Sequence, residues 1–223
     1  MKNSSKIIIA VAAVLCVALA LMLIFGNNST KDIPKTQYED LNAGADIELK
    51  ELSSYSGPYY EDGSDEKVSG VMQATVTNNS DCDIQFAYLR VADKAGNEYA
   101  FKITCLMRGE TAAVLEENRA SYKSAKSIES VTVDNIALFD SKPGMHNDIF
   151  ALLANGDSVT VINDDDIGHS NICVCYKNYD GDTAIGGITY RISVPHLESG
   201  ESAEVSTAHY NEGVSKFLFV TYE

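Results

Sequence analysis

Residues 106–111, LMRGET, recur ninety-one positions later as residues 197–202, LESGES. In each copy the leucine ends an apolar stretch, the glycine supplies a turn and the final hydroxyl residue begins another alternating stretch. Glycine suits such a turn because it lacks a Cβ and accepts a positive φ angle. A motif repeated at this distance predicts that one structural unit occurs twice in the chain.

Other features recur in the same order around this motif. They are a valine two positions before an asparagine, a polar turn after an apolar stretch, and a closing strand. The copies lie at 76–79 and 161–164, at 93–96 and 180–182, and at 131–133 and 217–220. Because the order is kept, the sequence predicts two copies of one β-sandwich, at residues 43–140 and 141–223.

Alternating side chains predict strands in both copies. Val68, Gly70, Met72, Ala74 and Val76 lie on one face of an extended stretch. Beyond residue 26 no stretch has a long amphipathic helical period, and Asn, Asp and Gly separate the short apolar stretches. The predicted fold class is therefore all-β, with two antiparallel sandwiches in tandem behind an N-terminal helix.

The repeated motifs resemble those of Ig-like sandwich domains in bacterial envelope proteins of the FxLYD-like type. The first copy carries Gly70, Val76 and the 78–80 NNS turn, then the 93–96 hairpin and LMRGET. The second copy carries the 163–164 turn, the 180–182 hairpin and LESGES. Arg108 and Ser199 stand where such domains most often have proline. The resemblance implies tandem Ig-like sandwiches used for display or protein interaction, and it brings no catalytic residues.

The N-terminal segment predicts a membrane anchor. Residues 7–25, IIIAVAAVLCVALALMLIF, are nineteen uncharged residues, close to the ~20 needed to cross a bilayer as a helix. Lys2 and Lys6 precede them and favour an N-terminus inside the cell. We expect a cytoplasmic end at 1–6, an anchor at 7–26 and a linker at 27–42. The alternative is a cleaved signal peptide and a secreted protein.

The charge of the chain excludes one class of partner. Seventeen basic residues stand against thirty-two acidic ones, which gives a formal net charge of -15. Such a surface repels phosphate backbones, so we expect no binding to nucleic acid. It also keeps an exposed domain soluble.

Four cysteines follow the anchor. A disulfide between Cys82 and Cys105 is possible in an oxidising compartment. Cys173 and Cys175 are two residues apart on a strand, point to one face and are poorly placed to bridge each other. The alternative is that the thiols are small buried apolar groups. A zinc site with His169 is only weakly indicated.

Two acidic turns of the second copy are candidates for calcium ligands. Their residues are Asp164, Asp165, Asp166, Asp180 and Asp182. Calcium needs several oxygen ligands converging on one point, and the EF-hand spacing fails because Ile167 and Val174 take positions where acids should stand. The remaining possibility is a site built from both loops, and otherwise these are solvated turns. No cofactor is expected.

Three tyrosines cluster in residues 53–66, SSYSGPYYEDGSDE. Tyr55, Tyr59 and Tyr60 would suit a protein contact if they were exposed, because tyrosine is frequent at interfaces. The alternative is a loop whose tyrosines cover the first sandwich.

These observations predict a non-enzymatic module of the cell envelope. The chain would be a single-pass membrane protein whose exterior domains bind an unidentified envelope or extracellular protein. The alternative is a secreted or anchored ligand-binding protein, or an enzyme accessory subunit, with a calcium or glycan site in the acidic loops of the second copy. Local signatures of hydrolases and phosphate-binding loops are absent from the sequence.

Overall fold

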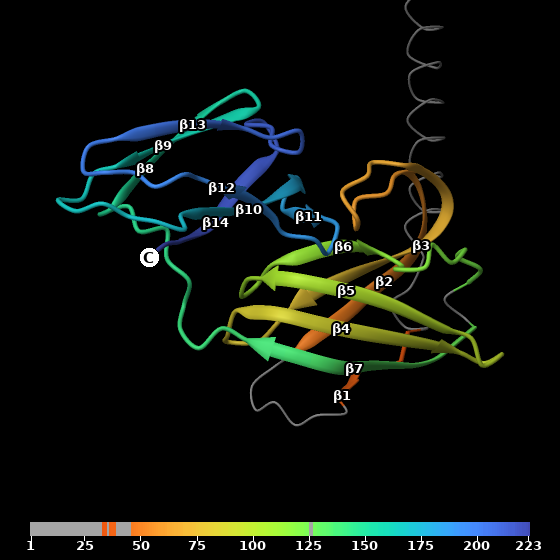
Figure 1. The fold of residues 1–223 in the computed structure, drawn as a ribbon. Coiled ribbons are helices and arrows are strands. Elements are labelled where there is room, and N and C mark those ends of the chain that lie inside the picture. Colours follow the sequence, from red (N-terminus) through yellow and green to blue (C-terminus); the bar gives the residue numbers. More distant parts are fainter. Residues whose placement is uncertain (1–32, 35, 39–45, 125–126) are drawn as a thin grey trace, which may run out of the picture. The chain divides into compact units, whose positions relative to one another are not determined.

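The computed structural model describes residues 33–34, 36–38, 46–124 and 127–223. In this part the chain is all-β, and its sheets form a sandwich-like arrangement (Figure 1). The residues from Ile33 to Glu223 form one compact unit. The anchor predicted at 7–26 and most of the linker predicted at 27–42 lie outside the described residues, and the boundary predicted after residue 140 stays a prediction.

Fourteen strands occupy the described part of the chain. They are β1 (Thr36–Tyr38), β2 (Ile47–Pro58), β3 (Lys67–Asn78), β4 (Ile84–Asp93), β5 (Glu98–Leu106), β6 (Thr111–Leu115), β7 (Ile128–Leu138), β8 (Phe150–Asn155), β9 (Ser158–Asn163), β10 (Cys173–Asp180), β11 (Thr183–Ile185), β12 (Tyr190–Ser193), β13 (Ser202–Ser206) and β14 (Ser215–Thr221).

The same strand order occurs twice. In the first strand set, β2–β7, one sheet runs β2-β3-β6 and the other runs β5-β4-β7. In the second strand set, β8–β10 with β12–β14, the sheets run β8-β9-β13 and β12-β10-β14. Each set therefore pairs its first, second and fifth strands in one sheet and its fourth, third and sixth in the other.

Each strand set has its own hydrophobic core. The alternation of the strands turns one face inward, as at Val76, Leu89 and Phe101 of the first set and at Val161 and Val174 of the second. All five side chains are fully buried. Of these positions, Val76 is predicted by the alternation in the sequence, because side chains of a strand point to opposite faces in turn.

A buried asparagine ends the second strand of each set. The Asn78 Nδ2 donates to the carbonyls of Leu106 and Cys82, at 3.0 Å in each case. The Asn163 Nδ2 donates to the carbonyl of Leu197 at 3.1 Å and to that of Ile167. Neither side chain is exposed to solvent.

The repeated L-x-x-G-E motif completes this network. Gly109 and Gly200 both have φ of 75° and donate their N–H to the carbonyls of Asn78 and Asn163. The carboxylates of Glu110 and Glu201 accept from backbone N–H groups three residues earlier. The motif therefore ties the fourth and fifth strands of each set to the second. The repeat found in the sequence marks equivalent positions of the two strand sets.

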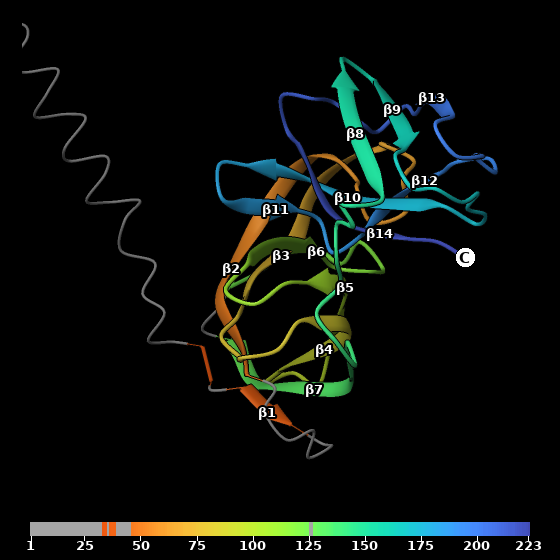
Figure 2. The same cartoon turned by 90° about the vertical axis from the view of Figure 1, so that its left-hand side faces the viewer.

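The short strand β11, which belongs to neither set, extends a sheet of the first set. After β10, β11 turns back and pairs in parallel with β6, with Ala184 opposite Ala112 (Figure 2). Tyr179 and Ala184 are consequently part of the core of the first strand set. The described residues contain no helix that is long and apolar enough to cross a membrane.

Candidate functional site

A pocket of about 950 Å³ lies where the two strand sets meet. Its walls come from β4 and β5 of the first set, from β10, β12 and β14 of the second, and from the segments around residues 61, 117 and 188. The adjoining Gly186–Thr189 segment runs along the edge of β5, where Thr104 N–H donates to the Gly187 carbonyl at 2.8 Å and the Thr104 and Thr189 hydroxyls lie 2.9 Å apart.

Gly187 packs closely against the backbone of β5. A Cβ added there would stand 1.9 Å from the carbonyl oxygen of Lys102. Only a residue without a side chain lets the segment reach the edge of β5, as a close backbone approach requires. This explains the glycine pair at 186–187, whose role the sequence does not reveal.

The Glu61 carboxylate holds the Gly187 segment from the other side. It accepts from the N–H of Gly187, at 2.8 Å to Oε2, and from the N–H of Leu115, at 2.8 Å to Oε1. Burial raises the pKa of Glu61 to about 7, although the two N–H donors and the charge of Lys177 oppose that rise. One carboxylate thus joins the hairpin after β2, the strand β6 and the second strand set.

Lys177 is a fully buried cation on β10. Its Nζ donates to the Gly187 carbonyl at 3.2 Å. Burial lowers the pKa of Lys177 to about 8, while the nearby Cys105, Glu61 and Glu110 oppose that change. A charge on a strand is expected on the solvent side, so the sequence alone does not indicate this position.

Three thiols line the pocket: Cys105, Cys173 and Cys175. Cys105 and Cys175 pack with Phe219 in a small apolar cluster between the strand sets. Burial raises the pKa of Cys105, and burial together with Cys173 raises the pKa of Cys175 to about 12. Cys105 has φ of 48°, a strained value for a residue with a Cβ. The thiols of Cys105 and Cys175 therefore remain protonated at neutral pH.

No disulfide joins the cysteines that the structure describes. The bridge predicted between Cys82 and Cys105 is therefore not formed. Cys82 lies in the turn after β3, where its carbonyl accepts from Asn78, whereas Cys105 belongs to the cluster with Cys175.

The predicted tyrosine cluster has an internal role. Tyr59 is 3% exposed and donates its hydroxyl to the backbone carbonyls of Glu116 and Glu117. Tyr55 is half-buried and donates to the Pro58 carbonyl at 2.9 Å. Tyr60 is half-buried and packs with both in one cluster. These tyrosines pack on Val71 and Leu115 of the first strand set, and their role in a protein contact stays a prediction.

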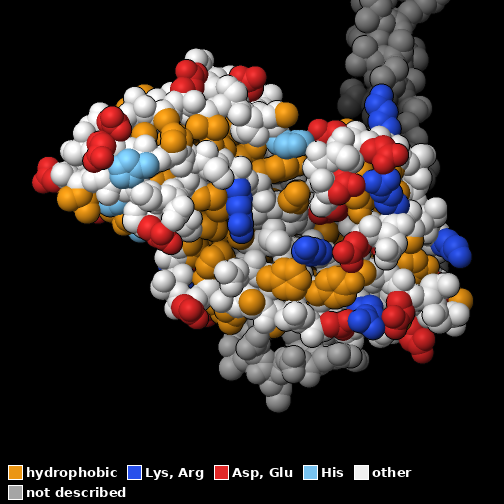
Figure 3. Space-filling model, in the orientation of Figure 1, with side chains coloured by type: hydrophobic (Ala, Val, Ile, Leu, Met, Phe, Trp, Pro, Cys, Tyr) orange, Lys and Arg blue, Asp and Glu red, His pale blue; other side chains and the backbone are white. Residues whose placement is uncertain are grey.

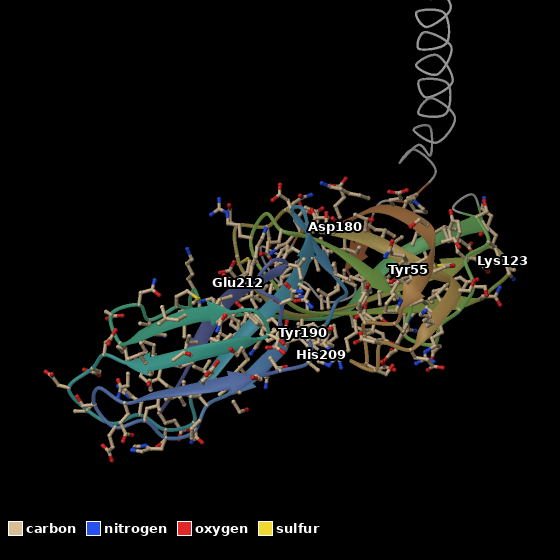
Figure 4. All side chains as sticks on the ribbon, turned by 90° about the horizontal axis from the view of Figure 1, so that it is seen from above. Tyr55, Lys123, Asp180, Tyr190, His209 and Glu212 are labelled. Carbon is tan, nitrogen blue, oxygen red and sulfur yellow. The ribbon has the colours of Figure 1, made fainter. Side chains whose placement is uncertain are left out.

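The loop that carries Tyr59 and Glu61 also contacts the second strand set. Arg119 holds the loop through Asp62, at 2.9 Å, while its guanidinium lies 4.5 Å from the ring centre of Tyr59. Asp65 lies 3.6 Å from His209, which stacks on Tyr190 (Figure 4). The segment predicted to meet a partner thus joins the two halves of its own chain.

The acidic turns do not converge on a metal. Among the residues that the structure describes, no three His, Cys, Asp or Glu side chains form a group that could hold a metal ion. Asp165 instead accepts from His169 at 2.8 Å. Asp182 is fully exposed 3.9 Å from Lys216. Asp164 and Asp166, which follow β9, and Asp180, the last residue of β10, are exposed.

Comparisons of the chain with protein-family models, with curated proteins and with solved structures give no match.

Proposed function

We propose that this protein is anchored in a membrane by residues 7–26 and presents two tandem Ig-like sandwiches outside the cytoplasm, as a non-enzymatic interaction or display module of the cell envelope. The repeated strand order carries the proposal. Pairing of the first, second and fifth strands in one sheet and of the third, fourth and sixth in the other is similar to the arrangement of Ig-like sandwiches.

The sequence of the N-terminal segment supports the anchored placement. A nineteen-residue apolar run behind two lysines suits a signal anchor with its N-terminus inside. Mass spectrometry of the mature N-terminus tests this placement. An intact N-terminus is expected, whereas a chain that begins near residue 27 would favour the secreted alternative.

Exposed apolar side chains give places to probe for a partner. Leu153 on β8 is 56% exposed and Ile167, in the turn after β9, is 62% exposed. Both belong to the second strand set. Single exposed apolar residues are common on protein surfaces, so these two positions are probes and do not by themselves define an interface.

Photo-crosslinking in intact cells tests the interaction function. The full-length protein would carry a photoreactive residue at position 153 or 167, with position 123, an exposed lysine, as the matched control. We expect one reproducible protein adduct from at least one of the two apolar positions and none from position 123. Recovery of the protein without any adduct from either apolar position would contradict an interaction module.

A further inference from the structure

We propose that the pocket between the strand sets binds a small organic anion, in which a carboxylate or sulfonate is attached to an aromatic or alkyl body. This inference goes beyond the proposed function, because it concerns a small-molecule ligand and not a protein partner. It rests on the charges and on the apolar side chains of the pocket wall.

Three acidic and three basic residues line the pocket, and most of them are engaged. Arg119 pairs with Asp62 and with Glu66. Glu117 accepts from the Tyr88 hydroxyl at 3.1 Å. The Glu61 carboxylate is held by backbone N–H groups. The acids of the pocket are therefore already bound by the protein.

Two basic side chains of the pocket wall have no acidic partner. In the described part of the chain neither Lys102, on β5, nor Arg191, on β12, forms an ion pair, and both are exposed. The other three arginines in the described part of the chain, Arg90, Arg108 and Arg119, all form ion pairs with acids. An exposed arginine is well suited to a carboxylate or sulfonate, which it binds through two N–H groups.

Apolar groups lie beside these cations. Phe86, Phe139, Phe219 and Ile188 line the same pocket, together with the thiols. The face seen in Figure 3 shows hydrophobic side chains next to lysine and arginine side chains. A pocket of about 950 Å³ is within the range of small-molecule sites. The chemistry therefore fits a ligand that is apolar at one end and anionic at the other.

Protection of a pocket thiol from alkylation tests the site in the full-length protein. The probe is 2-naphthalenesulfonate, and the readout is the rate at which iodoacetamide modifies Cys173, followed by peptide mass spectrometry. Cys173 lines the pocket and is half-buried. Cys82 is also half-buried but does not line the pocket, so it is the internal control. We expect the probe to slow alkylation of Cys173 several-fold and to leave Cys82 unchanged.

Charge variants test the role of the two cations. We expect Arg191→Gln and Lys102→Gln to raise the probe concentration for half-protection about tenfold each, which corresponds to about 1.4 kcal/mol, near the lower end for a charge-assisted hydrogen bond. The matched control is Lys123→Gln. Lys123 is exposed and lies far from Tyr190, the first residue of β12, in Figure 4. The uncharged 2-naphthalenemethanol should protect Cys173 more weakly and equally in all variants.

Three results would overturn the proposal. They are a lack of protection at Cys173, equal slowing at Cys82, and a half-protection concentration that neither Arg191→Gln nor Lys102→Gln changes. Cys105, which is 6% exposed, serves as a folding control. It should stay unreactive toward iodoacetamide in each variant in which the strand sets are still packed. Alkylation of Cys173 is measured without a partner protein. A negative result would therefore not contradict the proposed interaction function.

Discussion

Asn78 and Asn163 are fully buried, so their amide groups depend on hydrogen bonds within the protein. We expect Asn78→Ala and Asn163→Ala each to lower the free energy of unfolding by about 2 to 4 kcal/mol, because each change leaves buried carbonyls without a donor. Urea denaturation measures the loss. The neighbouring exposed residues provide matched controls, and Asn79→Ala and Asp164→Ala should cost less than about 1 kcal/mol. Equal losses in the buried and exposed variants would contradict the network.

Glu61 makes the stability depend on pH in a direction unusual for a carboxylate. Its pKa is about 7 in the folded protein and 4.5 as the reference value, so the folded state binds the proton more tightly. Stability from this group is therefore fully present below about pH 4.5 and is lost as the pH rises through 7. The difference between these two pKa values corresponds to about 3 kcal/mol of folding free energy.

Glu61→Gln isolates this effect. The variant keeps one oxygen, equivalent to Oε1, which accepts from the N–H of Leu115 at 2.8 Å and from that of Gly187 at 3.0 Å, but it cannot ionise. We expect its free energy of unfolding, relative to that of the natural chain, to increase between pH 4.5 and 7.5, as measured by urea denaturation at each pH. A difference that stays constant over this range would show that Glu61 does not titrate with the raised pKa.

At the level of strands, much of the fold could be predicted from the sequence. Alternation is a local property, so it predicted inward-facing positions such as Met72 and Val76. The repeated LMRGET and LESGES turns also mark equivalent points of the two strand sets. β11 could not be predicted, because its three residues are stabilised by pairing with β6, about seventy residues earlier.

Most of the candidate site could not be predicted from the sequence either, because contacts between distant segments bring its residues together. The structural roles of Lys177 and Gly187 depend on which distant segments pack against them. Tyr59 was identified as part of a cluster, but its burial under Arg119 follows from a contact that no local pattern encodes. The acidic turns are conspicuous in the sequence because Asp favours turns, whether or not a ligand is bound.

The Gly186–Thr189 segment should tolerate very little change. In Gly187→Ala the new Cβ would meet the Lys102 carbonyl, so the segment would have to move away from β5. We expect a loss of at least about 2 kcal/mol, since overpacking typically costs 1 to 3 kcal/mol and here backbone must shift. Gly213→Ala is the control, because its new Cβ would meet only an asparagine side chain, at 3.3 Å. Thermal unfolding compares the two variants. Equal melting temperatures would contradict the close approach.

In the whole molecule, the two strand sets share core residues and hydrogen bonds. Residues of β10 and β11 complete the first core, while the first set supplies Glu61 and the loop that reaches His209. Separate cores joined only by a linker would unfold independently, whereas shared hydrogen bonds and shared core residues couple them. The pocket exists only while this packing is intact.

Calorimetric unfolding of residues 33–223 tests this central claim most directly. We predict one cooperative transition, in which the calorimetric and van't Hoff enthalpies agree, because Tyr179 and Ala184 complete the core of the first strand set and both sets contribute to the cluster of Cys105, Cys175 and Phe219. Two separate transitions, each assignable to one strand set, would contradict the account.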